Sequence, residues 1–290
     1  SLACAKASAK FFKLPLYRYL GGVINTLPTP MMNIINGGCH SNNNLDFQEF
    51  MIIPMGFNSF SESLRAGCEI FQNLKILLQK KGYSISVGDE GGFSPEISSN
   101  KECLDLIIKS IDDSKYKPGK EVFIALDVAS SEFYKNKLYN LNGESLNLKS
   151  ESLIKYYENL LNNYPIISIE DGLDEEDWEG WKNLTDALGD KCQLVGDDLF
   201  VTSIDRLKKG IKNNCGNSIL IKLNQIGTIS ETIETIELAK KNNFNTIISH
   251  RSGETEDTFI ADLSVGVSAG QIKAGSLSPS HRFDRWKAMS

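Results

Sequence analysis

The chain has 290 residues, 41% of them hydrophobic and 23% charged, which is typical of a folded globular protein and long enough for one large barrel or two ordinary domains. The formal net charge of −6 disfavours a role in nucleic-acid binding, which requires a basic surface. No apolar stretch approaches the roughly 20 residues that cross a bilayer, so we expect neither nucleic acid nor membrane as a partner.

Six cysteines are spread along the chain, and none of them forms a CxxC pair. They are Cys4, Cys39, Cys68, Cys103, Cys192 and Cys215. An even number of cysteines says little about disulfides in a chain this long. We therefore expect reduced thiols in a cytoplasmic protein, without a structural zinc site.

The beginning of the chain is predicted to be helical. Residues 1–20 open with an alanine-rich stretch, and Gly21 and Gly22 end the helix, because glycine favours helix C-termini. Residues 26–30 contain two prolines and are predicted to form a linker.

Two strand candidates and two helices come next. The short apolar runs at 31–36 and 47–54 are typical of strands. A capping box at 59–62 predicts the start of a helix that continues to about Lys81. Residues 100–111 have the apolar spacing of a second helix, so two helices precede the next strand.

Five later apolar runs each end on a polar or charged residue. They are Val122–Asp127, Pro165–Glu170, Gln193–Asp197, Ser218–Lys222 and Thr246–His250, and a shorter sixth run is Gly270–Lys273. From Glu170 onward the ends lie 23 to 28 residues apart, which is room for one helix between strands. Helices are predicted at about 150–161, 175–188, 203–212, 230–242 and 258–267, and a β-meander at 132–148 with Gly143 in its turn.

This alternation predicts a parallel sheet covered on both faces, closed into a (β/α) barrel. Enzymes of that architecture carry their active sites at the rim where the strands end. The polar residues at the ends of the six runs would then share one rim, which suggests metal-assisted acid–base chemistry.

Asp127, Glu170 and Asp197 end three successive strands of the predicted barrel. Two like charges about 4 Å apart repel by about 4 kcal/mol at an effective dielectric near 20, so three carboxylates require a counter-charge. A hard cation such as Mg²⁺, which prefers oxygen ligands, would supply it. The alternative is that each carboxylate caps the following helix, which explains a single residue better than all three.

Two further strand ends suggest a base and an anion site. Lys222 follows a very apolar strand, where a desolvated lysine with a lowered pKa can act as a general base. The other interpretation is a buried salt bridge to the carboxylates, and the two do not exclude each other. Lys273 would supply positive charge nearby. His250, Arg251 and Ser252 are arranged like a cradle for an anion such as phosphate.

Two acidic residues before the regular array are weaker candidates. Glu90 lies in a glycine-flanked loop, and Glu49 lies 41 residues earlier in the chain. Two carboxyl groups in one site can push their pKa values apart, which leaves one of them protonated as an acid. His40 follows a Gly-Gly pair that is common in loops, so its spacing alone carries little weight.

Many segments of the chain, taken together, resemble enolase (phosphopyruvate hydratase) of the bacterial type. In order they are SLACAKASA, LPLYRYLGG, MMNIINGG, QEFMI, VGDEGGF, LDVASSEFY, SIEDGLDEEDW, VGDDLFVT, ILIKLNQIG, SHRSGETEDTFIADL and AGQIKAGS. The resemblance covers nearly the whole chain. It implies an α/β fold, an enolase-type, TIM-like (β/α)8 barrel with irregular first units.

The resemblance also implies an activity, the Mg²⁺-dependent and reversible dehydration of 2-phospho-D-glycerate to phosphoenolpyruvate in glycolysis and gluconeogenesis. Asp127, Glu170 and Asp197 would bind Mg²⁺, and Lys222 would remove the proton α to the substrate carboxylate. Lys273 would help to stabilise the charge that then develops.

The remaining roles are also carried over from the family. Glu90, supported by Glu49, would protonate the leaving hydroxyl, and Arg251 and Ser252 would hold the phosphate. The other residues implied to line the site are His40, Gln48 and His250, with His250 among the catalytic residues and Gln48 in contact with substrate.

Enolases carry an N-terminal α+β domain before the SLACAKA helix, and this domain bears a lid loop. We therefore expect residues 1–26 to be a helical linker from the junction with that domain, and 27–290 to be the barrel of a longer protein. The C-terminus also departs from the family pattern from Pro279 onward, so its final helix is expected to be short or atypical.

The resemblance implies a small-molecule substrate and a homodimeric full-length protein, the phosphopyruvate hydratase complex of the cytoplasm. Two alternatives stay open. The chain could be another enzyme of the superfamily that removes a proton α to a carboxylate without needing a phosphate. It could also be a non-catalytic barrel with a binding or structural role.

Overall fold

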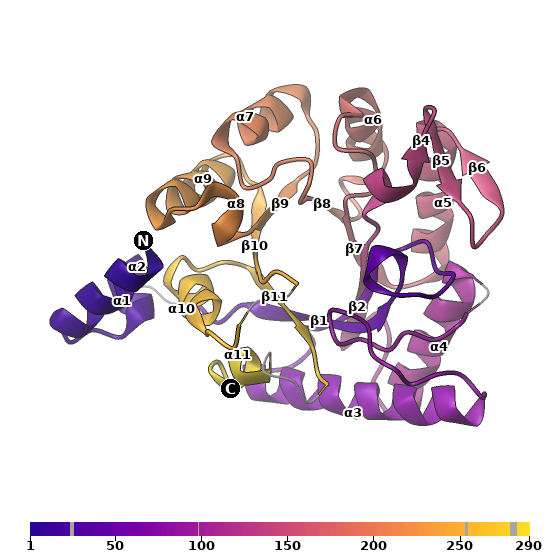
Figure 1. The fold of residues 1–290 in the computed structure, drawn as a ribbon, viewed down its shortest axis with the longest axis horizontal. Helices are drawn as coiled ribbons and strands as arrows, with labels where there is room; N and C mark the ends of the chain where they lie inside the picture. Colours follow the sequence, from indigo (N-terminus) through magenta and orange to yellow (C-terminus); the bar gives the residue numbers. More distant parts are fainter. Residues whose placement is uncertain (24–25, 98, 253–254, 279–282) are drawn as a thin grey trace.

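The computed structural model describes residues 1–23, 26–97, 99–252, 255–278 and 283–290. Eight strands close into a barrel with helices around it (Figure 1). In spatial order the strands are β1 (Thr29–Asn36), β11 (Gln271–Ser276), β10 (Asn245–Ser249), β9 (Ser218–Ile221), β8 (Gln193–Gly196), β7 (Ile166–Glu170), β3 (Val122–Asp127) and β2 (Glu49–Pro54). The expected α/β barrel is confirmed.

The direction of β2 departs from the expected parallel sheet. β2 pairs antiparallel with both β1 and β3, whereas the other neighbouring strands are parallel. The first residue of β2, Glu49, therefore lies opposite the last residue of β3, Asp127. A residue at the start of one strand thus reaches the rim where the other strands end.

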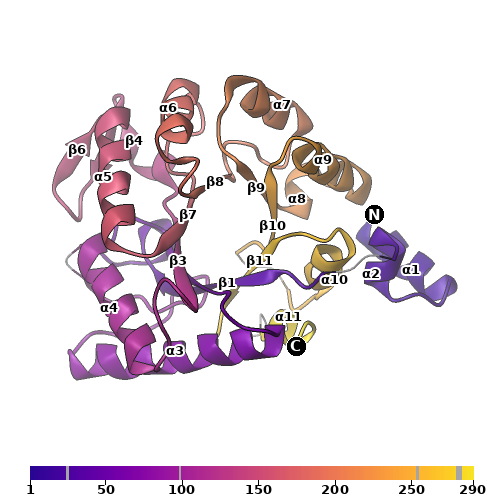
Figure 2. The ribbon, with the colours of Figure 1, turned by 180° about the vertical axis from the view of Figure 1, so that it is seen from behind.

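The helices surround the strands, as both views show (Figure 2). The longer ones are α3 (Phe60–Lys80), α4 (Asn100–Asp113), α5 (Ser150–Asn163), α6 (Trp178–Leu188), α7 (Ile204–Asn213), α9 (Ile229–Lys241) and α10 (Phe259–Gly266). The predicted capping box before α3 forms, since the Ser59 side chain accepts a hydrogen bond from the Glu62 backbone N–H. As predicted, α3 and α4 follow one another before β3.

Residues 1–20 form two helices rather than one. α1 (Leu2–Phe11) ends before Pro15, and α2 (Leu16–Gly21) begins directly after it. The residue before a proline is disfavoured in the helical conformation, which explains the break. α2 packs against α10, at the outer edge of the barrel (Figure 1).

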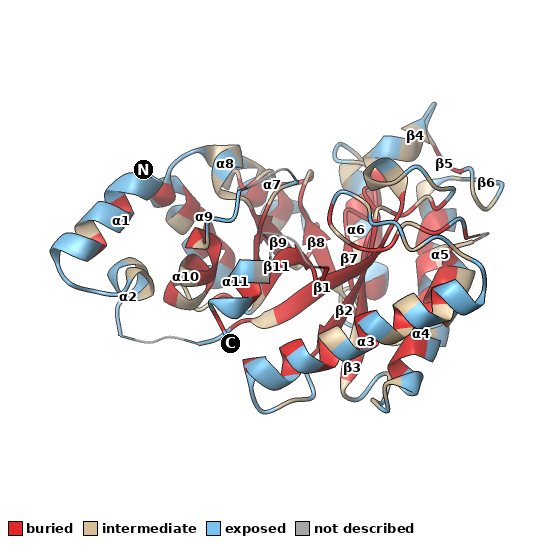
Figure 3. Cartoon of the chain, turned by 60° about the horizontal axis from the view of Figure 1, so that its bottom comes forward, coloured by how far each residue is buried: buried red, intermediate tan, exposed pale blue. Residues whose placement is uncertain are grey.

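The core has two parts. Most buried apolar side chains lie between the strands and the helices, and a smaller cluster fills the inside of the barrel. The inner cluster consists of Met31, Met51, Ile53, Ala125, Val195, Leu220 and Ile247. The strands are accordingly buried along their length (Figure 3). Because apolar side chains fill the interior, a polar site has room only at an end of the barrel.

Several short elements complete the fold. The predicted meander is a separate sheet of β4 (Tyr134–Lys135), β5 (Leu138–Leu141) and β6 (Leu146–Leu148), with Gly143 in the turn before β6. It follows η2 (Ser130–Phe133), and η1 (Gly38–His40) follows β1. A four-residue helix, α8 (Leu223–Ile226), follows β9 and was not predicted.

The C-terminal helix α11 (Phe283–Lys287) is short, as expected. Residues 279–282, where the departure from the family pattern begins, lie outside the described part of the chain. Trp286 is fully buried and its indole N–H donates to the Ser276 carbonyl at 3.2 Å. This contact ties α11 to β11. Within the described residues, no helix is both long and apolar enough to span a membrane.

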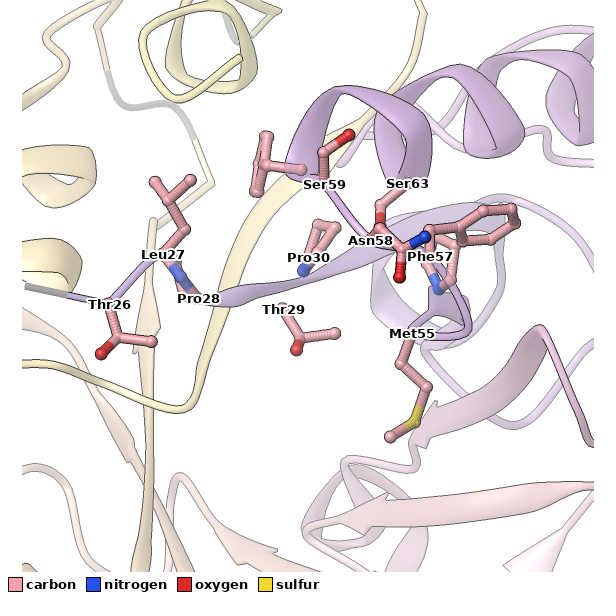
Figure 4. Close-up of a pocket in the computed structure, with 12 residues that line it drawn as sticks. Thr26, Leu27, Pro28, Thr29, Pro30, Met55, Phe57, Asn58, Ser59 and Ser63 are labelled. Carbon is pink, nitrogen blue, oxygen red and sulfur yellow. The ribbon is translucent and has the colours of Figure 1, made fainter.

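A pocket of about 460 Å³ lies where β1 begins and β2 ends, which is the end of the barrel away from the polar rim (Figure 4). Its described lining includes Leu27, Pro30, Met55 and Phe57, with hydroxyl groups such as Ser59. None of its described lining residues is charged. This pocket therefore lacks groups for acid–base chemistry.

Candidate active site

The polar ends of the barrel strands gather at one rim. Asp127 and Glu170 are the last residues of β3 and β7, and Asp197 and Lys222 directly follow β8 and β9. His250 directly follows β10. Parallel strands present these ends on the same side, and the reversed β2 adds Glu49 to them.

Most of the predicted residues line one pocket of about 110 Å³ at this rim. Its lining residues are His40, Gln48, Glu49, Glu90, Asp127, Lys222, Ser249, His250, Arg251, Ser252 and Lys273. Ser249 was not predicted, because as the last residue of an apolar strand it carried no signal of its own. Glu170 and Asp197 are not in the lining and are instead paired with Lys273 and Lys222.

Lys273 is the centre of the buried charge. Its ammonium nitrogen lies 2.8 Å from Asp127 Oδ2, 3.0 Å from Glu170 Oε1 and 3.4 Å from Glu49 Oε1. Burial alone would lower the pKa of Lys273, but the three carboxylates outweigh it and raise the pKa well above its usual range. Lys273 therefore stays charged and neutralises part of the acidic cluster.

The same cluster shifts the pKa values of Glu170 and Asp127 in opposite directions. Burial raises the pKa of Glu170, and the charge of Asp127 adds to the rise. Burial would also raise the pKa of Asp127, but the charge and hydrogen bond of Lys273 outweigh it and lower that pKa. Asp127 is therefore the carboxylate that remains ionised most readily beside Lys273.

Lys222 forms an ion pair with Asp197, and its side chain is 16% exposed. Burial would lower the pKa of Lys222, but the charges of Asp197 and Glu170 outweigh it, so the pKa is raised. The salt bridge considered from the sequence is present, and the pKa of Lys222 is raised where the sequence led us to expect a lowered one. The sequence could not show that two carboxylates would lie so close to this lysine.

Glu90 is brought to the rim by a loop packed on β1. The Phe93 backbone N–H donates to the Ile34 carbonyl at 2.9 Å, and the Asp89 backbone N–H donates to the His40 carbonyl at 3.2 Å. A Cβ on Gly92 would lie 2.9 Å from the Ile34 backbone carbonyl carbon and 2.8 Å from Asn33 Oδ1, so only glycine fits there without a shift.

The Glu90 carboxylate is held by two residues of the predicted anion cradle. His250 Nε2 lies 2.8 Å from Glu90 Oε2, and the Ser252 hydroxyl donates to Glu90 Oε1 at 2.5 Å. Arg251 lines the pocket beside them and is partly buried. Gly253 and Glu254, in the same motif, lie outside the described residues.

His40 and Glu49 lie next to Glu90, although the sequence spacing gave little reason to expect it. One ligand atom from each of these three residues lies within 4.8 Å of the other two. Burial raises the pKa of Glu49 to about 8, with a further contribution from the Glu90 charge, although Lys273 opposes it. Burial lowers the pKa of His40. Burial therefore favours the protonated form of Glu49.

A family model described as Enolase, C-terminal TIM barrel domain, matches residues 24–289. The chain belongs to the enolase family. It is 58% identical over 286 residues to a curated protein named Enolase from Natranaerobius thermophilus, an alignment that covers 98% of the chain. The alignment covers 66% of that enolase, so the chain spans just under two thirds of the relative's length.

The residues of this enolase barrel fit a hard divalent cation in their chemistry. The three implied ligands, Asp127, Glu170 and Asp197, offer only carboxylate oxygens, which Mg²⁺ prefers. Among the described residues, Asp127 Oδ1 is buried without a hydrogen-bond partner, and such an oxygen is suited to a cation. Both lysines at the rim already place positive charge against this set.

The three implied ligands are not gathered as tightly as other groups. Among the described residues, the clusters with ligand atoms within 4.8 Å are His40 with Glu49 and Glu90, and Asp171 with Asp197 and Asp198. Lys273 contacts Asp127 and Glu170, while Lys222 holds Asp197. Asp127, Glu170 and Asp197 therefore lie at one rim, but the first two pair with Lys273 and the third pairs with Lys222.

Proposed function

We propose that the chain carries the catalytic barrel of a Mg²⁺-dependent hydro-lyase that interconverts 2-phospho-D-glycerate and phosphoenolpyruvate. Family membership supports an enolase-like activity. The observation that carries the proposal is that Lys222 and Glu90 line one small pocket and are held by different partners, Asp197 and His250. Such a pair can remove one proton and deliver another.

Removal of the proton α to the substrate carboxylate is assigned to Lys222. The ion pair with Asp197 favours the protonated form of Lys222. To act as the base, the amine must first release that proton to solvent, which a cation bound by Asp197 would favour by offsetting the charge of this carboxylate. Mg²⁺ held by Asp127, Glu170 and Asp197 would supply positive charge against the substrate carboxylate as it gains charge. Lys273, charged and buried beside Asp127, is placed to add to that stabilisation.

Departure of the hydroxyl group is assigned to Glu90. Its carboxyl group would give a proton to the leaving oxygen, and His250 and Ser252 fix its orientation. Glu49, whose raised pKa favours the protonated form, would limit the repulsion that a second charge causes at this point. Arg251 would bind the phosphate, and Ser252 would join it by turning its hydroxyl hydrogen from Glu90 to a phosphate oxygen, while His40 and Gln48 line the site.

We also propose the domain bounds of the chain and the oligomeric state of the full-length protein from the family resemblance. Residues 1–26 would be a helical linker and 27–290 the barrel domain, since α1 and α2 precede the first barrel strand and pack on its outside. The full-length protein would be a homodimer in the cytoplasm, acting in glycolysis and gluconeogenesis.

The direct test is formation of phosphoenolpyruvate, followed by its ultraviolet absorbance, when 2-phosphoglycerate and Mg²⁺ are added to the purified chain. We expect turnover that disappears in Lys222→Ala, with circular dichroism showing that the variant is folded. A folded wild-type chain that binds Mg²⁺ without turnover would favour a non-catalytic barrel. Preference for unphosphorylated D-glycerate would favour another enzyme of the superfamily.

A further inference from the structure

A closed ring of hydrogen bonds joins the proposed base to a proposed metal ligand through two residues that have no assigned role. The Lys222 backbone N–H donates to Thr202 Oγ1 at 2.9 Å, and that hydroxyl donates to Gln225 Oε1 at 2.7 Å. Gln225 Nε2 then donates to Asp197 Oδ1 at 3.1 Å. The ring closes where the Lys222 ammonium pairs with Asp197 Oδ2.

The direction of every hydrogen bond in this ring is fixed by chemistry. The Thr202 hydroxyl accepts the Lys222 backbone N–H, so its single hydrogen is available for Gln225. The Gln225 carbonyl oxygen then faces Thr202, and its amide nitrogen faces Asp197. A carboxylate only accepts, so that nitrogen matches Asp197. The flipped amide would set its carbonyl oxygen against the Asp197 carboxylate, which places two acceptors together at that contact.

The backbone around Thr202 is unusual. Val201 and Thr202 both have positive φ values, of 43° and 56°, and β-branched residues rarely adopt that conformation. Thr202 is fully buried, and Thr235 of α9 donates to its carbonyl oxygen at 3.2 Å. Such strain persists only where the surroundings impose it, and here it places the hydroxyl between the strand end at Lys222 and the side chain of Gln225.

The short helix α8 positions the Gln225 side chain beside Asp197. Lys222 is its N-cap residue, and the Gln225 backbone N–H donates to the Lys222 carbonyl at 3.1 Å. One turn of helix thus returns the Gln225 side-chain amide to the end of β9, from which α8 starts. Asp197 is held on its other side, since its backbone N–H donates to Asp171 Oδ1 at 2.9 Å.

We propose that Thr202 and Gln225 are positioning residues that fix the Asp197 carboxylate for the metal and for Lys222 together. The inference rests on the proposed function, because the roles of Asp197 and Lys222 come from it. One oxygen of Asp197 is held by Gln225 and the other by Lys222, so the carboxylate plane cannot turn freely. Loss of the ring would weaken metal binding and misplace the base at the same time.

The test compares Thr202→Val, which has nearly the same shape but no hydroxyl, with Thr202→Ser, which keeps it. Mg²⁺ affinity is measured by titration calorimetry without substrate, and exchange of the α-proton of 2-phosphoglycerate is measured in D₂O. We expect the valine variant to bind Mg²⁺ at least about 10-fold more weakly and to exchange about 10- to 100-fold more slowly, mainly through kcat. The serine variant should stay within about twofold of wild type for both, since its hydroxyl can make the same bonds.

Thr232→Val is the matched control, because Thr232 is equally buried but its hydroxyl donates only to the Thr228 carbonyl of its own helix start. It should leave Mg²⁺ affinity unchanged. Equal Mg²⁺ affinity in Thr202→Val and Thr202→Ser would overturn the proposal, whether or not the chain shows turnover. Wild type without turnover, but with weaker Mg²⁺ binding in Thr202→Val alone, would contradict the proposed function and leave the ring's role supported.

Discussion

Glu49 and Asp127 lie directly opposite each other across the antiparallel pair of β2 and β3, and the Lys273 ammonium contacts both. This relationship joins a residue from the irregular start of the barrel to the regular array of strand ends. It also creates a buried cluster in which one lysine balances several carboxylates. The stability of the metal-free protein should therefore depend on Lys273.

Replacing Lys273 by methionine should destabilise the metal-free protein by about 3–5 kcal/mol, because removing one partner of a buried ion pair leaves uncompensated charge. Mg²⁺ should recover part of the loss, since it would act on the same carboxylates. Urea unfolding with EDTA and with Mg²⁺ measures both effects. Lys6→Met, which removes an exposed pair with Asp257, should cost less than about 1 kcal/mol, and an equal loss in the two variants would contradict this account.

Glu49→Gln should change how stability depends on pH. The pKa of Glu49 is raised from 4.5 to about 8, so between these values the folded protein keeps a proton that the unfolded chain has released. The contribution of Glu49 to the free energy of unfolding of the wild type is therefore complete below pH 4.5 and is lost as the pH rises to about 8. The glutamine variant lacks this loss.

In urea unfolding with EDTA, Glu49→Gln should gain stability relative to wild type between pH 5 and pH 9, by an amount on the order of a few kcal/mol. Titrating groups remote from Glu49 affect both proteins alike and cancel in the difference, whereas the charges of Lys273, Asp127 and Glu90 act on Glu49 itself and are part of the difference. Parallel stability curves for the two proteins would show that Glu49 is not held protonated.

Gly92→Ala should displace the loop that carries Glu90. An added Cβ would lie 2.9 Å from the Ile34 backbone carbonyl carbon in β1, as well as 2.8 Å from Asn33 Oδ1, so the loop must move. A shift of about 1 Å at a catalytic group can cost about 100-fold in rate, and we expect a loss of that order in kcat. Gly270→Ala, where a Cβ meets nothing within 4 Å, is the control and should keep wild-type activity.

Arg251→Ala should raise KM for 2-phosphoglycerate more than it lowers kcat, if Arg251 binds the phosphate in both the ground state and the transition state. Arg251→Lys keeps the charge but not the forked geometry, so it should recover only part of the affinity. Steady-state kinetics of the two variants decide the point. An unchanged KM in Arg251→Ala would remove Arg251 from the proposed phosphate site.

The sequence predicted the strand ends well because their signal is local. An apolar run that ends on Asp127, Glu170 or Lys222 is visible without knowledge of its neighbours, and the structure places all three at one rim. The capping box at Ser59 is local in the same way, and it formed as expected. The direction of β2 is not local, since alternation of side chains is the same for a strand in either direction.

The charge state of the rim could not be predicted for a related reason. Whether Lys222 has a lowered or raised pKa depends on how close Asp197 and Glu170 lie, and that is decided by the closure of the barrel. Thr202 and Gln225 were part of recognised segments but carried no signal of their own. A threonine at positive φ or a glutamine in a one-turn helix becomes informative only once its partners are known.

In the proposed reaction Lys222 removes one proton and Glu90 delivers another, and the two steps can be measured separately. Nuclear magnetic resonance in D₂O follows exchange of the α-proton of 2-phosphoglycerate, while absorbance follows phosphoenolpyruvate. We predict that Glu90→Gln loses dehydration but still exchanges the α-proton, whereas Lys222→Ala loses both. Exchange that survives in Lys222→Ala, or vanishes in Glu90→Gln along with dehydration while Mg²⁺ still binds, would contradict this division of roles.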